Sequence, residues 1–361
     1  MEVRPYQSTV AREHGRDANP SPKSLVVDIH GHMLVPEADE LVRPHLPASE
    51  LDAVKYASPY TREVNVKQNK DRHEALVGNE QRFKEMDQMG VDVMVISPAP
   101  PQFNYQADAS LCHEASQLVN NRLVAAVKED SDRLVALGTV PLQDTDLAIS
   151  ELTRCVRDLG MAGIEIGANA GSDELSAERL EPFWSKVEEL NVPILLHPTA
   201  FASDRFGAHY LTNVIGNPLE TTLAVHYLIF DGVMERHPKL RIVVSHGGAF
   251  VSHYAARMDH AWGARPDCCL HIEQPPTSYL DRFYFDTIVF AIDQLAFITE
   301  KFGSDRILLG TDFPFDMGEY DPVEHVCQVP GLTEDDRERM CGGNALALLG
   351  LNEKQFAKRR T

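Results

Sequence analysis

The sequence has no apolar run approaching the roughly 20 residues that a transmembrane helix needs. Its first residues also lack the apolar core of a secretory signal peptide. The six cysteines include no Cys-x-x-Cys pair, and we interpret them as reduced, mostly structural thiols. These absences together predict a cytoplasmic protein that neither spans nor enters a membrane.

Positive charge is also scarce. The 361 residues carry 54 acidic and 34 basic side chains, for a formal net charge of -20. Such a balance disfavours binding to nucleic acid or to an anionic membrane surface. A small anionic substrate therefore needs a local positive site, supplied by a metal ion or by specific arginines.

No Gly-x-Gly-x-x-Gly turn follows any predicted strand, so we expect no dinucleotide and no other organic cofactor. Short apolar strands instead alternate with amphipathic helices, a pattern typical of a parallel sheet covered by helices. The eight strands are expected at residues 25–30, 91–97, 134–140, 162–166, 192–197, 240–246, 283–286 and 307–312. This α/β pattern predicts a (β/α)8 TIM-type barrel, with an open doubly wound sheet as the alternative.

Two segments depart from the alternation. Residues 1–23 are polar and are predicted to form a flexible N-terminal arm, ahead of a barrel over residues 24–361. Residues 33–78, which follow the first strand, are charged, weakly periodic and interrupted by four prolines. We expect this segment to form a small insertion or lid over the site that the first strand opens.

The first strand ends in a His-x-His pair. Alternate residues of a strand point the same way, so His30 and His32 are expected to project from one face. Two converging imidazoles can bind a divalent metal ion. The alternative interpretation is a hydrogen-bonded pair of histidines in a turn.

Three later strands also end in a residue that can bind metal or carry a proton. The fifth ends in His197, the sixth in His246 before two glycines, and the eighth in Asp312. In a (β/α)8 barrel the chemistry lies at the C-terminal ends of the strands. Four such strand ends favour a metal-dependent site over chance placement.

This order of residues resembles the amidohydrolase superfamily, and more narrowly amidohydrolase-related family 2. Within it the chain is most similar to the aminocarboxymuconate semialdehyde decarboxylase group of metal-dependent decarboxylases. The resemblance extends from about residue 25 to residue 351, and the most specific stretches are residues 82–87, 163–167, 246–250, 265–267 and 309–314.

The resemblance implies a single divalent metal ion, Zn²⁺ in the first place and Mn²⁺ as the alternative. Its ligands are implied to be His30, His32, His197 and Asp312. His246 is implied to be the catalytic acid/base, although a fifth ligand is the alternative role for it. Asp312 is a second candidate for proton delivery. The fourth strand contains no lysine that could be carboxylated, which favours one metal ion over two.

The resemblance also implies substrate contacts. Arg257 matches an arginine that reaches a substrate carboxylate across a dimer interface in the family, and Arg265 is a second candidate; an interface ion pair is the alternative role. Arg72 lies about one residue from the position of the family's other substrate arginine. Phe103, with Tyr105, can stack on a planar substrate or pack within its loop. A homodimer or higher homo-oligomer is implied.

We therefore predict a non-oxidative decarboxylase of a small unsaturated or aromatic carboxylic acid, of the carboxymuconate or hydroxy- and aminobenzoate types. The alternative is a metal-dependent hydrolase or hydratase acting on a lactone, an amide or a C–C bond. A barrel that binds a metal without turnover is the non-enzymatic alternative. Thr199 and Glu165 stand where the named decarboxylase has Trp and Gln, so the substrate can differ while the chemistry is kept.

Overall fold

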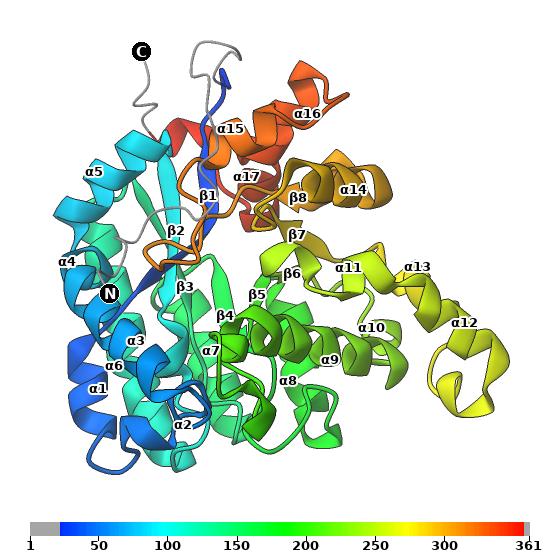
Figure 1. Ribbon diagram of the computed structural model, residues 1–361, viewed down its shortest axis with the longest axis horizontal. Helices are drawn as coiled ribbons and strands as arrows, with labels where there is room; N and C mark the ends of the chain where they lie inside the picture. The colour runs from blue at the N-terminus through cyan, green and yellow to red at the C-terminus, as the bar shows by residue number, and fades with distance from the viewer. Residues whose placement is uncertain (1–21, 357–361) are drawn as a thin grey trace.

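Eight parallel strands form one sheet in chain order in the computed structural model, which describes residues 22–356. Each strand pairs in parallel with the next along the chain. The strands are β1 (Val27–Met33), β2 (Val93–Pro98), β3 (Leu134–Gly138), β4 (Gly163–Gly167), β5 (Ile194–His197), β6 (Ile242–Val244), β7 (Tyr284–Asp286) and β8 (Ile307–Leu308). Figure 1 shows this sheet with helices around it.

The chain that follows β8 returns alongside β1 and closes the barrel. The Ile29 amide donates to the Leu309 carbonyl at 2.9 Å, and the Asp312 amide donates to the His30 carbonyl at 2.8 Å. These bonds connect the first and last strands, so the predicted (β/α)8 barrel is confirmed and the open sheet is excluded.

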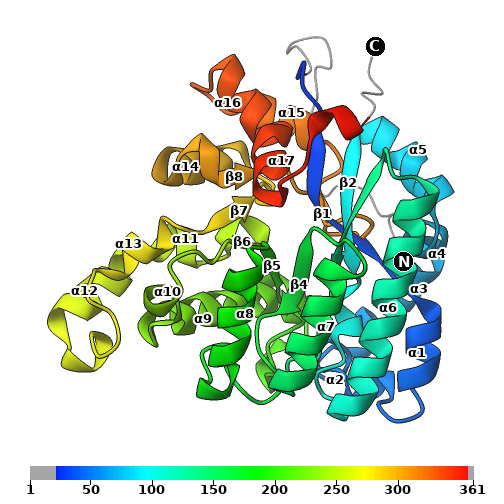
Figure 2. The same cartoon turned by 180° about the vertical axis from the view of Figure 1, so that it is seen from behind.

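Helices form the outer layer of the barrel (Figures 1 and 2). Those that cover the sheet or cap its ends are α5 (Asn79–Met89), α6 (Ala109–Glu129), α7 (Thr145–Arg157), α8 (Glu181–Leu190), α9 (Asn217–Phe230), α14 (Ile292–Phe302) and α17 (Asn344–Leu349). No helix of the described residues combines the length and the apolar character that crossing a bilayer requires.

Six of the predicted strands are shorter than expected, and the sixth and eighth differ most. The sixth ends at Val244 rather than at residue 246, and the eighth ends at Leu308 rather than at residue 312. At each end the chain enters the left-handed region, with φ +55° at His246 and +58° at Asp312. Strained conformations of this kind cluster at functional sites, and here they belong to two of the predicted site residues.

The barrel interior is apolar at one end and polar at the other. Val27, Val95 and Leu195 belong to a cluster that joins six strands to α17, and they are almost fully buried. The histidines at the C-terminal ends of the strands lie beyond this apolar plug. This closely packed apolar cluster rigidly supports the side chains at the C-terminal ends of the strands.

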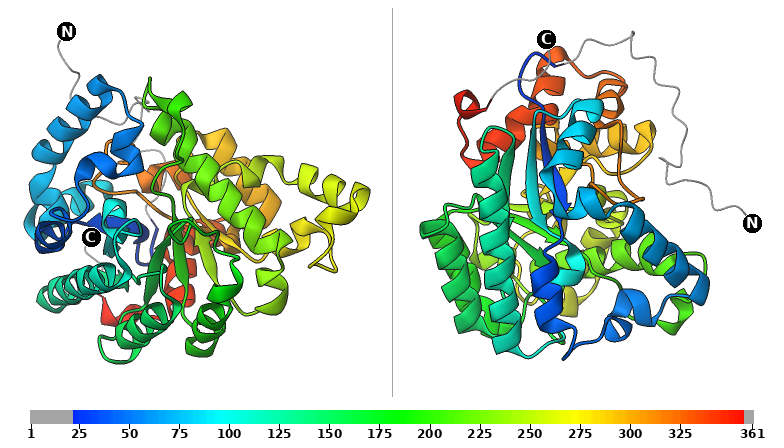
Figure 3. Two further views of the ribbon diagram at one scale, coloured as in Figure 1. Left: turned by 90° about the horizontal axis from the view of Figure 1, so that it is seen from below. Right: turned by 90° about the vertical axis from the view of Figure 1, so that its left-hand side faces the viewer.

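Residues 33–78 contain four helices, α1 (Pro36–Val42), α2 (Asp52–Lys55), α3 (Pro59–Asp71) and α4 (His73–Val77). They lie to one side of the barrel, drawn in blue in Figure 3. Residues of α2 and α3 line a cavity together with His197 and Asp312. Two helices of this segment therefore border the site, and its role as a lid stays a prediction.

A second segment projects from the opposite side of the molecule. The helix α12 (Ala256–Ala264), which follows α11 (Val251–Tyr254), leads into an extension drawn in yellow in Figures 1 and 2. Arg257 and Arg265 lie on or next to α12. The predicted N-terminal arm, residues 1–23, falls outside the described residues except for its last two.

Candidate functional site

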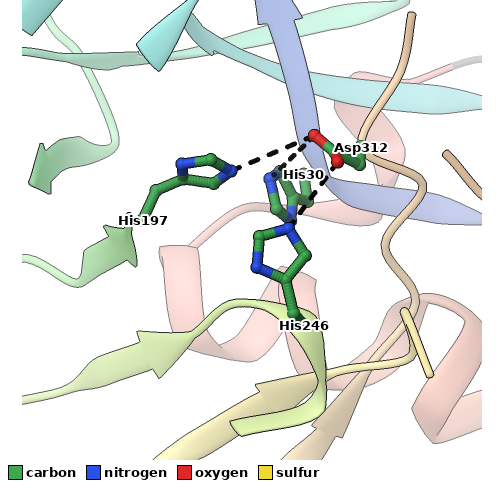
Figure 4. Close-up of side chains that lie close together, drawn as sticks. All are labelled: His30, His197, His246 and Asp312. Carbon is green, nitrogen blue, oxygen red and sulfur yellow. Dashed lines mark ion pairs between the residues drawn. The ribbon is translucent and has the colours of Figure 1, made fainter. Parts of the chain in front are cut away.

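Four imidazoles and one carboxylate meet at the C-terminal ends of the strands, and Figure 4 shows four of these five side chains. His30 and His32 come from β1, His197 from the end of β5, and His246 and Asp312 from the turns after β6 and β8. The ring centroids of His30, His32 and His197 are 4.9–5.0 Å apart, and His246 lies 5.0 Å from His197. The structure therefore brings together all five residues predicted from the strand ends.

The two oxygens of Asp312 face different histidines. Its Oδ1 lies 3.1 Å from Nε2 of His32, 3.6 Å from Nε2 of His30 and 4.0 Å from Nε2 of His197. Its Oδ2 lies 3.6 Å from Nε2 of His246. Three imidazole nitrogens thus lie around Oδ1 of Asp312. His246 lies apart from them, next to Oδ2.

Hydrogen bonds assign the tautomers of the three grouped histidines. Each donates its Nδ1 hydrogen to an oxygen outside the group: His30 to Asp286 Oδ2 at 2.8 Å, His32 to the Pro98 carbonyl at 3.0 Å, and His197 to the Pro198 carbonyl at 2.7 Å. The Nε2 lone pairs consequently face inward.

Those inward lone pairs fit a cation. The Nε2 atoms of His30 and His32 are only 3.0 Å apart, and the buried Nε2 of His197 has no hydrogen-bond partner. Two lone pairs at this distance repel each other unless a positive centre lies between them and the third. Three imidazoles and one carboxylate suit a divalent transition metal ion.

Burial and mutual charge set the protonation states. Burial lowers the pKa of His30 and holds that of His197 well below its usual range, so both rings stay neutral. Burial raises the pKa of Asp312, but its interactions with His246 and His32 outweigh burial and hold the pKa well below its usual range. Burial lowers the pKa of His246, but Asp312 outweighs it and raises that pKa above the ordinary value.

A buried carboxylate on β7 connects the histidines, and the sequence interpretation missed it. Asp286 accepts from His30 Nδ1, and also from the backbone amides of His246 at 3.0 Å and Gly247 at 2.7 Å. Its hydrogen bond to His30 contributes to a pKa below its usual range, despite burial. Its position at the end of the seventh predicted strand was the available signal, because the other site residues also lie at or just after strand ends.

The turn that carries His246 consists of consecutive left-handed residues. Gly247 and Gly248 have φ +60° and +77°. A Cβ on Gly247 would lie 2.1 Å from Val289 Cγ1, and one on Gly248 would lie 2.6 Å from the Phe285 ring. Glycine is therefore required at both positions by backbone conformation and by packing, and this holds His246 against the barrel.

Glu165 of β4 is a fully buried carboxyl group beside the histidines. Its Oε1 lies 3.8 Å from Nδ1 of His32, and neither of its oxygens has a hydrogen-bond partner. Burial raises its pKa to about 8. Candidate metal ligands from Glu165, His30, His32 and His197 all lie within 4.8 Å of one another.

Two cavities meet at Asp312. The larger, about 1060 Å³, has mostly apolar walls and includes His246 and Arg257. The smaller, about 200 Å³, is lined by His197, Thr199 and residues of α2 and α3. A small molecule in either cavity can reach the histidines.

The three predicted substrate residues differ in placement. Arg257 lines the larger cavity, and its role as a substrate contact stays a prediction. Arg72 forms two hydrogen bonds to the Glu85 carboxylate and one to the Pro314 carbonyl, so its guanidinium is already occupied. Phe103 is buried and stacks on Tyr105 with ring centroids 5.6 Å apart, and neither cavity is lined by it.

Comparison with known proteins places this site among related sequences. The family model described as Amidohydrolase, Amidohydro_2, matches residues 27–351. The chain is 33% identical over 277 residues to 2-amino-3-carboxymuconate-6-semialdehyde decarboxylase of Dictyostelium discoideum, which covers 76% of this chain and 77% of that protein.

Solved structures show the same architecture. A 2,6-dihydroxybenzoate decarboxylase complexed with 2,6-dihydroxybenzoate is 26% identical, with a TM-score of 0.77, and covers 91% of this chain and 100% of that one. A dihydroxybenzoic acid decarboxylase from Polaromonas sp. JS666, with bound manganese and the inhibitor 2-nitroresorcinol, is 23% identical with a TM-score of 0.76, and covers 91% of this chain and 97% of that one. The likeness to the second establishes the fold alone.

Proposed function

The chain belongs to the amidohydrolase family, and from this premise we propose that it is a metal-dependent non-oxidative decarboxylase of a small unsaturated or aromatic carboxylic acid. One observation supports this proposal above the others. Three inward Nε2 lone pairs and the ionised Asp312 form a cation site directly beside the acid/base candidate His246. The similar decarboxylases support carboxy-lyase chemistry on that site.

His30, His32, His197 and Asp312 are the proposed ligands of one divalent metal ion. When bound, such an ion polarises a substrate oxygen as a Lewis acid and supplies positive charge that balances the substrate carboxylate. The imidazole majority favours Zn²⁺, and the mixed nitrogen and oxygen donors also accept Mn²⁺. Asp286 holds the His30 ring in the tautomer that binding requires.

His246 is the proposed acid/base. Loss of CO₂ leaves an electron pair on carbon, and that carbon must receive a proton. His246 is positioned for this step by the strained turn and by Asp286, and Asp312 Oδ2 favours its protonated form. A positioned proton carrier of this kind typically contributes 10²- to 10⁴-fold in rate, stated as an order-of-magnitude range.

Arg257 is the proposed contact for the substrate carboxylate. It lies on α12, the projecting helix, and lines the larger cavity with His246. A guanidinium offers two parallel hydrogen bonds to a carboxylate. Its place on a projecting element also allows it to serve the site of a partner in the proposed homodimer, which is the alternative to its own subunit's site.

Elemental metal analysis combined with a CO₂-release screen tests the proposal. We expect one equivalent of Zn²⁺ or Mn²⁺, and CO₂ from a hydroxybenzoate, an aminobenzoate or a carboxymuconate. His246→Gln should keep the metal and release CO₂ roughly 10²- to 10⁴-fold more slowly. The exposed control His45→Gln should match the wild type.

Two outcomes would contradict the proposal. Bound metal without CO₂ from any substrate, but with hydration or hydrolysis products, favours the hydratase or hydrolase alternative. A folded protein that binds no divalent metal would remove the basis for both.

A further inference from the structure

Tyr210, in the loop after β5, carries a hydroxyl group that forms no hydrogen bond with any of the described residues. By contrast, Tyr105, Tyr279 and Tyr320 each use the hydroxyl in a hydrogen bond. Burial raises the pKa of Tyr210, and the negative charges of Asp316 and Asp312 raise it further. The hydroxyl is therefore shielded from water and lies near both carboxylates. Polar groups in such surroundings are nearly always paired, so the hydroxyl is available to a ligand.

The backbone that carries this side chain is strained. His209 and Tyr210 have φ +56° and +58°. Among the described residues only one other run of consecutive positive φ values occurs, at 246–249, and that run carries the proposed acid/base. The Tyr210 carbonyl accepts two backbone amides of the π-helix Thr212–Gly216, each at 3.0 Å. Left-handed residues other than glycine and π-helical turns are both frequent at functional sites.

The surroundings of Tyr210 indicate what it can bind. It lines the smaller cavity together with His197 and Asp312, two of the proposed metal ligands. No lysine or arginine is present among the described residues that line this cavity. A carboxylate that reaches the metal site from here must satisfy its remaining lone pairs with neutral donors. The Tyr210 hydroxyl is such a donor, and its hydrogen is not committed to another group.

We propose that Tyr210 is a substrate-binding residue whose hydroxyl donates a hydrogen bond to the substrate's carboxylate at the metal site. This inference rests on the proposed function, since it places a carboxylate at the metal ion. Tyr210 stays protonated and holds the substrate, whereas His246 supplies the proton. Arg257 lines the other cavity, so the two donors approach the carboxylate from different sides.

Calorimetric titration of the metal-loaded protein with benzoate tests this contact without turnover. Tyr210→Phe removes only the hydroxyl group. We expect the dissociation constant of benzoate to rise roughly 10- to 100-fold with the metal content unchanged, as for loss of a hydrogen bond to a charged group. Tyr227→Phe is the matched control, because Tyr227 is 38% exposed on α9 and lines neither cavity.

A second variant keeps the test sharp if Tyr210→Phe does not fold. Asparagine adopts left-handed backbone readily, and its side chain is too short to place a donor where the tyrosine hydroxyl lies. Tyr210→Asn should therefore weaken benzoate binding as well. In the CO₂-release assay, loss of a contact made to the bound substrate should raise KM more than it lowers kcat.

Either of two results would overturn the inference. One is equal benzoate affinity in the wild type and in Tyr210→Phe, with metal retained in both. The other is metal-loaded wild type that binds no benzoate. Weaker benzoate binding in Tyr210→Phe without CO₂ release from any acid would instead contradict the decarboxylase proposal alone, and the Tyr210 contact would stand.

Discussion

Asp286 is a single carboxylate that positions both halves of the site. One of its oxygens accepts from the His30 ring and from the His246 amide, and the other accepts from the amides of Gly247 and Ile288. The proposed metal ligand and the proposed acid/base are therefore held at a fixed separation by one side chain. A carboxylate suits this role because it accepts several hydrogen bonds and has no hydrogen to donate.

Asp286→Asn should weaken metal binding and slow turnover together. The amide places an NH₂ group against backbone donors, and the His30 ring loses its charged acceptor. We expect metal affinity to fall roughly 10- to 100-fold, as for other partners that orient metal-binding histidines. Competition with a chromophoric chelator measures the affinity, with Asp305→Asn as the control. Unchanged affinity in Asp286→Asn would show that His30 does not need this contact.

Glu165 should make the stability of the metal-free protein depend on pH. Burial raises its pKa from 4.5 to about 8 in the folded state. Between these values the folded protein holds a proton that the unfolded chain has released, so stability falls as pH rises. The slope that Glu165 contributes is at most about 1.4 kcal/mol of unfolding free energy per pH unit, and Glu165→Gln should remove it.

Chemical denaturation of both metal-free proteins from pH 5 to pH 8 measures the effect. The unfolding free energy of the variant should rise relative to that of the wild type as pH rises. The cost of burying an amide does not vary with pH, so it cannot produce this trend. Parallel stability curves would mean that Glu165 ionises normally in the folded protein.

The turn after β6 is the element on which the acid/base depends. Four consecutive residues, 246–249, have positive φ, and two of them are not glycine. Left-handed backbone is costly for residues with a Cβ, so the turn needs the hydrogen bonds that Asp286 provides. The element is therefore strained locally and stabilised by a strand that follows it in the chain.

Gly247→Ala tests the turn. The added Cβ would lie 2.1 Å from Val289 Cγ1 in a left-handed conformation, so we expect a loss of about 1–3 kcal/mol in unfolding free energy. Turnover should fall while metal is retained, because the ligands lie on other elements. Gly263→Ala in α12 is the control, since its Cβ meets nothing within 4 Å and alanine favours a helix. Equal stabilities of the two variants would contradict the packing argument.

At the scale of the whole molecule, the barrel lies between two peripheral segments that border different cavities. The helices α2 and α3 border the smaller cavity, and the projecting α12 carries Arg257 at the larger one. The protein has a net charge of -20, so an anionic substrate depends on the metal site and on such an arginine. A shared site between two subunits follows if the projecting segment reaches a partner.

Mixing two inactive variants tests the shared site. Arg257→Ala should weaken substrate binding without loss of metal, and His30→Ala should lose metal. If Arg257 serves the partner subunit, random hybrid dimers contain one intact site and should recover about a quarter of wild-type activity. Activity is measured after subunit exchange, with each variant alone as the control. No recovery from verified hybrids would place Arg257 in its own subunit's site.

The sequence by itself determined the barrel and the residues that gather at its open end. Alternation of apolar strands with helices specifies a parallel barrel, and parallel strands all end on one face. His30 and His197 therefore meet at one face, and Asp312 follows the end of β8 by only four residues. Their roles as ligands remain predictions, but their convergence needed only the position of each strand end.

Only the tertiary structure decided which other groups face that end. Asp286 bonds to His30 across 256 positions, and residues of α2 and α3 line a cavity with His197 only because those helices pack beside the barrel. Arg72 of the same segment forms hydrogen bonds to the Glu85 carboxylate, a pairing that the sequence did not indicate. Side chains on loops and lids take their direction from long-range packing and ion pairs, which no local periodicity encodes. The strand ends could thus be read from the sequence, whereas the lining of the cavity could not.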